Sequence, residues 1–586
     1  MNTLNTMKLA VSALVLASVS GVSVAGEKEE LLKLKSTTES LIKQLVKQGV
    51  LTEQTANGMF KQAEADANKL AEQAETKAAI SQAAAIGTPE AGEVRVPYVP
   101  DFVKDEIREQ VRAELRQDVV GDVLTHAKKE RWGIADALPE WTRKFKLSGD
   151  ARLRYEPVFM AKSNQGDLSI FPFYPNGQAI NEMGGSSNTG LDLIRNTTED
   201  NQRFRERVRL GIDADIVEGV KAGVRLSTGN LRDPVSTNQT LGQTGQRYEF
   251  SLDRAFLQYD YTDSHGFDRL TLAGGRVKNP FFVGGGDFTS GSELVWDTDL
   301  SFEGFYGTYR HNLGEKNTVG DGARLMYATL GAFPVQEAPF SSNDKWLFGA
   351  QLGMDWGFKN KDTLRAGIAY YDYTNITAKP NTTFSGTCDL NSRENTASRP
   401  DFLQGGNTLA TICRDGSYND LVLSQFPGMV GLASDFNIIN FNMRYDMALF
   451  DPIHLTVAGD FAKNVGFSSR AVADNRVLGG ALGSGAVGEE TNAWQVRADL
   501  GWLRVDKKGH WSTFLAYKWV ERDAVLDAYS DSDFHLGGTN AKGWVLGANY
   551  GLLDNLWLTS RWLTTESIIG PSFGADVFQF DVNTRF

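Results

Sequence analysis

Apolar and polar residues alternate through most of the chain. The last eleven residues show this most clearly, because one parity is mainly apolar and the other is polar or charged: Phe578, Phe580, Val582, Thr584 and Phe586 against Gln579, Asp581, Asn583 and Arg585. A period of two is that of a β-strand, whose successive side chains point to opposite faces. A strand with one apolar and one charged face is typical of a wall between lipid and water.

Sixteen segments carry an alternation of this kind. They cover residues 144–156, 203–216, 219–228, 248–261, 268–278, 301–311, 322–332, 346–358, 361–373, 436–448, 452–462, 492–504, 510–521, 541–552, 555–566 and 576–586. The connections are alternately long and short, as the outer loops and periplasmic turns of outer-membrane barrels are. The pattern therefore predicts an all-β, transmembrane, up-and-down antiparallel β-barrel of about 16 strands. Barrels of 16 to 18 strands are wide enough to hold an aqueous channel.

A different pattern precedes the predicted barrel. Residues 1–25 have the features of a secretory signal peptide, with Lys8, an apolar stretch and small residues before Gly26. Residues 26–140 carry apolar residues at spacings of three, four and seven, which favours an α-helical or coiled-coil arm. An even strand count places both ends of the barrel, residues 141–586, on the periplasmic side. We therefore expect a periplasmic arm that is either a solvated stalk or a trimerisation element or cell-wall tether.

Composition excludes several classes of protein. The net charge is -13, and after the signal no apolar run approaches the roughly 20 residues of a membrane helix. An α-helical membrane protein and a basic nucleic-acid-binding protein are therefore excluded. The six histidines are scattered, and no catalytic, metal-binding or phosphate-loop motif is present. The sequence predicts no enzymatic activity, no metal and no cofactor.

The two cysteines, Cys388 and Cys413, fall within the longest predicted outer loop. In the oxidising compartment implied by the signal peptide, a disulfide closing that loop is expected. Two free thiols are the alternative.

Four arginines of one parity form the sharpest charge feature: Arg203, Arg205, Arg207 and Arg209. On the lipid side each would cost about 2–4 kcal/mol near the midplane, so this arginine ladder must face the lumen. Arg152, Arg154 and Arg225 face the same way by their own alternation. The ladder either forms a basic wall that biases ions, or pairs with inward carboxylates such as Asp150, Asp213 and Asp215 and rigidifies the wall.

The chain resembles the putative porin family of Gram-negative outer membranes. The resemblance rests on the signal, on the segment Leu-Ile-Lys-Gln-Leu-Val-Lys-Gln-Gly-Val-Leu-Thr at 41–52, and on a barrel that closes on Phe586. Phe578, Phe580, Val582 and Phe586 resemble the outer-membrane assembly signal, which implies recognition by the barrel assembly machinery.

General diffusion porins fold the loop after the fifth strand into the pore. Here that loop is 279–300, which opens with Pro280 and has Phe281 where those loops have glutamate. It carries four acidic residues: Asp287, Glu293, Asp297 and Asp299. The resemblance implies a constriction loop with an acidic face opposite the arginine ladder, and an ordinary surface loop is the alternative.

Two functions follow from these observations. The first is a porin for passive diffusion of small hydrophilic solutes and ions. The second is a non-conducting barrel that acts as a structural tether or as a surface adhesion protein. The expected partners are outer-membrane lipid, the barrel assembly machinery, peptidoglycan through the arm, and two further copies in a homotrimer. No nucleic-acid partner is expected.

Overall fold

A computed structural model describes residues 144–171, 173–284, 293–314, 324–338, 341–382, 388, 394–414, 427–474 and 488–586. The predicted signal peptide (1–25), the predicted arm (26–140) and Asp287 lie outside the described residues. The chain divides into two units, residues 1–125 and residues 126–586, and the second unit contains the fold described below.

The second unit is a closed antiparallel barrel of 16 strands. The strands are β1 (Phe145–Met160), β2 (Asn201–Val217), β3 (Val220–Ser227), β5 (Ser251–Thr262), β6 (Asp268–Lys278), β7 (Ser301–Asn312), β8 (Arg324–Gln336), β9 (Lys345–Gly357), β10 (Thr363–Thr374), β13 (Asn437–Phe450), β14 (Ile453–Asn464), β15 (Asn492–Gly501), β16 (Trp511–Val520), β17 (Ala541–Leu553), β18 (Leu556–Ser567) and β19 (Gly574–Arg585). Each pairs with its neighbour, and β1 pairs with β19 to close the barrel. The short β4 (Gln239–Thr240) adds to β2 beyond the end of β3.

All sixteen predicted strands are confirmed, with ends that differ by a few residues. The largest extensions are at β1 and β8. β1 continues to Met160 because this stretch still pairs with β19, where Met160 lies opposite Ala575. Apolar side chains of one parity are exposed, as Leu153, Phe204 and Phe305 show. Exposed apolar side chains form the face that contacts lipid in a membrane barrel.

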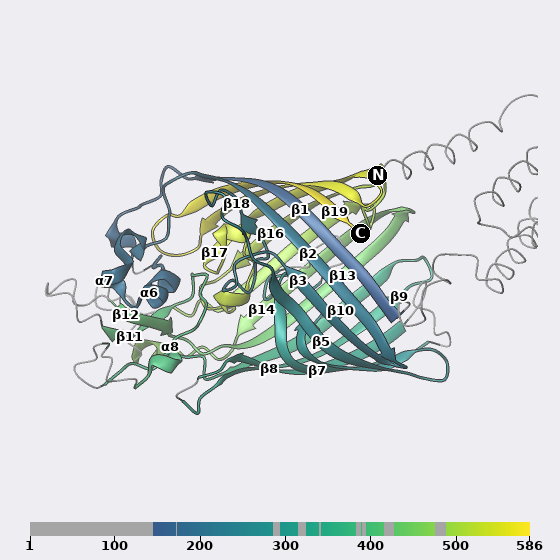
Figure 1. Cartoon of the computed structure of the whole chain (residues 1–586), viewed down its shortest axis with the longest axis horizontal. Coiled ribbons are helices and arrows are strands. Elements are labelled where there is room, and N and C mark those ends of the chain that lie inside the picture. Colours follow the sequence, from purple (N-terminus) through teal and green to yellow (C-terminus); the bar gives the residue numbers. More distant parts are fainter. Residues whose placement is uncertain are drawn as a thin grey trace, which may run out of the picture. The chain divides into compact units, whose positions relative to one another are not determined.

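The connections differ in length at the two ends of the barrel. Residues 218–219, 358–362, 451–452 and 554–555 form short turns at one end. Long connections at the other end carry α6 (Gly177–Met183), α7 (Ser186–Thr189), α8 (Ser469–Asp474) and the hairpin of β11 (Leu409–Arg414) and β12 (Pro427–Leu432). Figure 1 shows these elements gathered at one end and the C-terminus near the other. Among the described residues, no helix is long and apolar enough to cross a membrane.

An apolar cluster fills part of the barrel interior. Inward side chains of β7 to β10, among them Phe302, Phe333, Leu347 and Tyr371, are buried against residues of the loops. Inward residues of β13 to β16 extend the cluster around the wall. The lumen therefore has an apolar side along β7 to β10 and β13 to β16, and its charged side lies on other strands.

The C-terminal residue belongs to the seam between the first and last strands. The backbone N–H and C=O of Phe586 both bond to Gly149 at 3.0 Å, while the ring is 68% exposed. The ring also lies over Gly149, where a Cβ would come within 2.2 Å of it. The last residue therefore completes the pairing that closes the barrel.

Deleting Phe586, or replacing it by Asp, should impair barrel assembly. The change removes the last bonds of the closing seam or places a charge among lipid-facing residues. The measurement is the fraction of heat-modifiable, folded barrel in the outer membrane, with Phe586→Tyr as the matched control. Normal amounts of folded barrel in the deletion variant would contradict the assigned role.

Candidate functional site

The arginine ladder lies on the inward face of β2, opposite charged residues of β1. The cross-strand pairs along this seam are Asp150–Arg209, Arg152–Arg207, Arg154–Arg205 and Glu156–Arg203. Two Arg–Arg pairs therefore stand between two acid–arginine pairs. Like charges directly opposite each other are destabilising, so the ladder requires carboxylates from other elements.

Each arginine of the ladder has a carboxylate partner. Glu156 pairs with Arg203 and with Arg205, the latter at 3.6 Å. Asp150 pairs with Arg207 at 3.0 Å and with Arg209 at 2.8 Å. These ion pairs support the interpretation in which the ladder rigidifies the wall. Asp215, in contrast, pairs with Lys146.

The first-strand arginines differ in their surroundings. Arg154 is 2% exposed and contacts three carboxylates: Asp581 at 2.7 Å, Asp533 at 3.1 Å and Glu156 at 3.4 Å. Arg152 donates to Asn238 and, among the described residues, forms no ion pair. Arg154 therefore joins β1, β19 and a loop, whereas Arg152 adds positive charge to the lumen wall.

The described parts of the predicted constriction loop, residues 279–284 and 293–300, fold into the barrel. Phe281 lies against Gly349 on the inner face of β9, where a Cβ would come within 2.4 Å of its ring. Trp296 is 1% exposed, with its ring centroid 4.9 Å from that of Tyr371 and 5.0 Å from that of Phe302. Pro280 is the second residue of this connection. The aromatic side chains of this loop therefore anchor it on the apolar side of the lumen.

A second connection, 521–540, also folds inward, and the sequence pattern gave no sign of it. It carries the short 3-10 helices η7 (Asp527–Tyr529) and η8 (Phe534–Leu536). The two loops bond to each other, because the Asp297 N–H donates to the Tyr529 carbonyl at 2.7 Å and its carboxylate accepts from the Ser532 N–H at 2.9 Å. Asp533 in this connection also pairs with Arg561 of β18.

The three acidic residues described in the predicted constriction loop, Glu293, Asp297 and Asp299, do not form one acidic face. Asp299 reaches the arginine ladder, 3.1 Å from Arg209 and 3.5 Å from Arg207. Burial raises the pKa of Asp299, but Arg207 and Arg209 outweigh it and hold the pKa well below its usual range. Burial and the neighbouring Glu293 raise the pKa of Asp297 well above its usual range. Asp299 therefore lies against the basic wall and not across the lumen from it.

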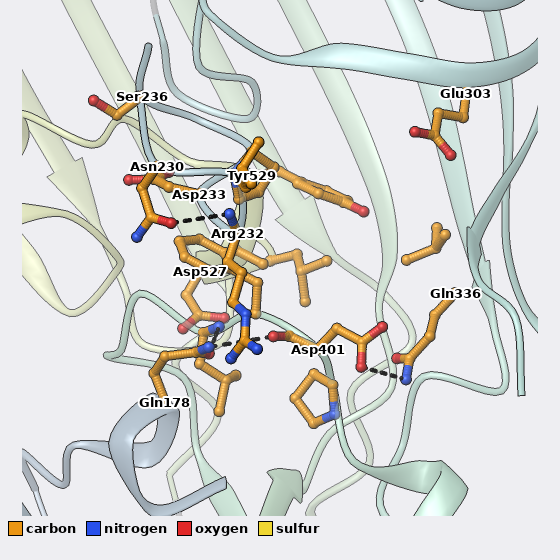
Figure 2. A pocket seen from close by; sticks show the side chains of 18 of the residues that line it. Gln178, Asn230, Arg232, Asp233, Ser236, Glu303, Gln336, Asp401, Asp527 and Tyr529 are labelled. Atoms are coloured by element: carbon orange, nitrogen blue, oxygen red, sulfur yellow. Dashed lines mark hydrogen bonds between the residues drawn. The ribbon is translucent and has the colours of Figure 1, made fainter. Parts of the chain in front are cut away.

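A cavity of about 970 Å³ lies between the long connections, above this layer of ion pairs. Figure 2 shows polar side chains from several of these connections pointing into it. The Gln178 side chain donates to the Asp401 carbonyl at 3.3 Å, and Gln336 donates to the Asp401 carboxylate at 3.0 Å. Asp299 and Asp253 also line the cavity. It is therefore a chamber with polar and apolar lining, whose wall includes carboxylates that pair with the arginines.

The sequence pattern of the putative porin family matches residues 35–586 of this chain. The chain belongs to the putative porin family. Its members are outer-membrane channel proteins, which places the exposed apolar face of this porin against outer-membrane lipid. No curated protein sequence matches the chain.

Several solved structures are similar to this porin. They include Pseudomonas putida OprB at high pH (11% identity, 78% of this chain and 97% of that one, TM-score 0.41), the outer membrane channel DcaP of Acinetobacter baumannii (10% identity, 75% and 97%, TM-score 0.37) and Salmonella typhi OmpF in complex with daunomycin (12% identity, 75% and 97%, TM-score 0.37).

Cys388 and Cys413 form a disulfide in this porin. The N–H of Cys388 also donates to the carbonyl of Arg414, at the end of β11. Among the described residues, no group of three histidine, cysteine or acidic side chains could hold a metal ion.

The stability of this porin should depend on pH through Glu293. Burial and Asp531 raise the pKa of Glu293 from its usual 4.5 to about 7, against the opposing charges of Lys518 and Arg561. Between these two values the folded barrel holds more protons than the unfolded chain, so stability should fall as the pH rises through this window and level off above it. Asp297 acts with the same sign.

The measurement is the urea midpoint of unfolding at pH values across this window. Glu293→Gln should reduce the slope, whereas Glu566→Gln, which changes an exposed glutamate on β18, should leave it unchanged. Equal slopes in the wild type and the Glu293 variant would contradict the assigned pKa.

Proposed function

We propose that this porin is a passive diffusion channel for small hydrophilic solutes and ions. The observation that carries the proposal is the chamber of about 970 Å³ that borders the charged lumen wall. Its carboxylates Asp253 and Asp299 pair with arginines of β3 and β2. Buried charges are costly unless water or partners solvate them, so a charged inner wall fits a water-filled path along β1, β2 and β3.

One feature of the barrel favours a second function. The apolar cluster fills the side of the lumen formed by β7 to β10 and β13 to β16. The two inward loops extend from it across the lumen, because Asp299 reaches Arg209 of β2 and Asp533 reaches β1 and β18. A barrel filled in this way could be non-conducting and act as a structural tether or a surface adhesion protein. Under either function we further propose a helical periplasmic arm that binds peptidoglycan, assembly into a homotrimer, and recognition by the barrel assembly machinery.

Single-channel recording in a planar lipid bilayer distinguishes the two functions. Stepwise openings whose conductance rises with salt concentration support the channel. A barrel that is folded by its heat-modifiable mobility and yet electrically silent supports the tether or adhesion protein.

The arginine ladder should influence ion preference in the open channel. Replacing Arg203, Arg205, Arg207 and Arg209 together by glutamine leaves Asp150, Glu156 and Asp299 without these partners, so the lumen becomes more negative. The zero-current potential in a salt gradient should shift toward cation selectivity, and the shift should shrink at high salt because the Debye length falls. An unchanged potential in a folded, open variant would place the ladder away from the conduction path.

A further inference from the structure

A second cavity, of about 280 Å³, lies against the inner wall formed by β2, β3, β5 and β6. Its charged lining consists of three basic residues and one acidic residue: Arg225, Arg254, Lys278 and Asp213. Ser148, Gln258 and Tyr306 complete its polar lining. The arginines of the ladder do not line it, so this cavity is a separate basic site.

Two of the arginines that line this cavity face each other in the sheet. Arg225 of β3 lies directly opposite Arg254 of β5, an arrangement that costs free energy unless negative charge compensates it. The nearby carboxylate of Asp253 pairs with Arg225 through Nε. Arg254 reaches the same carboxylate only through Ser301, whose hydroxyl accepts from Arg254 at 3.3 Å and donates to Asp253 at 3.3 Å.

A single carboxylate does not satisfy this pair of guanidinium groups. Nη2 of Arg225 is buried and, within the part of the chain that the structure describes, has no hydrogen-bond partner. A buried unpaired donor on a charged group is costly, and a guanidinium is suited to bidentate bonding with a carboxylate or phosphate. The arrangement therefore leaves a buried guanidinium donor that an oxyanion could satisfy.

The position of this cavity connects it with the proposed path. Asp253 lines the larger chamber, and Arg225, its ion-pair partner, lines the smaller cavity. The Arg225–Asp253 pair therefore stands between the two spaces. A solute with a negative group can compete with Asp253 for Arg225 and Arg254 as it moves from the chamber to the cavity.

We propose that the cavity between Arg225, Arg254 and Lys278 binds small oxyanions, the chemistry shared by inorganic phosphate and short carboxylates. The proposal rests on the proposed channel function and names the class of solute that the path retains. Small anions should occupy the site transiently and slow the passage of chloride.

Two measurements test the site with inorganic phosphate and with acetate as probes. The first is the saturable loss of chloride conductance in a planar bilayer as each anion is added. The second is the ³¹P line broadening of phosphate by detergent-solubilised full-length porin, which needs no conduction. Arg254→Gln should raise the half-saturating phosphate concentration about tenfold or more, because one charge-assisted hydrogen-bonding group is lost.

Matched variants separate binding from folding. Lys278→Gln changes an exposed residue of the same cavity and should weaken phosphate binding even if the Arg254 variant fails to fold. Arg444→Gln removes the same charge from the inner face of β13, outside the cavity, and should leave phosphate binding unchanged.

The outcomes distinguish this site from the channel function. Saturable phosphate effects that weaken in the Arg254 and Lys278 variants support the site. A conducting porin with no saturable phosphate or acetate effect, or with equal effects in the Arg254 and Arg444 variants, overturns the site while the channel stands. If the barrel does not conduct but broadens the ³¹P line of phosphate, and Arg254→Gln reduces that broadening, the channel is refuted while the site stands. If the barrel neither conducts nor broadens the line, both are refuted.

Discussion

Replacing Arg154 by glutamine should destabilise the folded barrel by about 3–5 kcal/mol, the usual cost of removing one partner from a buried ion pair. The guanidinium makes two hydrogen bonds to Asp581, at 2.7 and 2.9 Å, and so fastens β1 to β19 at the closing seam. It also holds Asp533 of the inward connection 521–540 at 3.1 Å. The substitution leaves buried carboxylates without this cation in the seam and in the loop.

The measurement is urea unfolding in lipid vesicles followed by tryptophan fluorescence. Arg232→Gln serves as the control, because Arg232 is largely exposed and its pair with Glu182 is at the surface, where such pairs contribute about 0–1 kcal/mol. Adding Asp581→Asn to the Arg154 variant should recover part of the loss, since it removes one orphaned charge. A loss in Arg154→Gln no larger than that in the control would contradict this role.

The position of Arg154 on the inner face was predictable, but its partners were not. The alternation of β1 assigns the side chain to the lumen, because burying it in lipid is costly. Asp533 is separated from it by 379 residues and belongs to a loop without periodicity. Which loop turns inward depends on packing between distant elements, which a local pattern does not contain.

Asp253 shows a second reason why sequence reasoning fell short. The register of β3 with β5 passes from Arg225–Arg254 to Leu226–Leu252 and skips Asp253, which is a β-bulge. A bulge interrupts the strict alternation of faces, so Asp253 and Arg254 both reach lumen cavities although they are consecutive. Strict alternation along β5 would place only one of these two side chains on the lumen face of the strand.

The hairpin of β11 and β12 was missed for a related reason. β11 is buried on both faces over Leu409–Cys413, because it lies among the long connections and neither of its faces contacts lipid or open water. Its residues therefore form a mainly apolar run without alternation, broken only by Thr411, and such a run by itself does not distinguish a strand from other buried segments. The strands of the barrel wall were predictable because lipid and lumen impose opposite demands on alternate residues.

Replacing Trp296 by alanine should release the constriction loop and raise the single-channel conductance of the proposed channel. Trp296 is 1% exposed and packs against Tyr371, Phe302 and Tyr529. Truncating a buried tryptophan typically costs about 3–5 kcal/mol. The remaining anchors, Phe281 and the backbone of Asp297, then hold a loop that has lost its largest apolar contact.

The control is Trp544→Ala, which removes a tryptophan that is 49% exposed on β17 and packs against Tyr517. Both variants lose an indole, but only Trp296 belongs to the constriction loop, so only its loss should change conductance. The Trp296 variant should also become more accessible to protease at residues 293–300, because loss of docking exposes their backbone. If conductance stays at the wild-type value while the loop becomes protease-sensitive, the loop packs on the wall without narrowing the path. The arginine seam of β1 and β2 would then be the constriction.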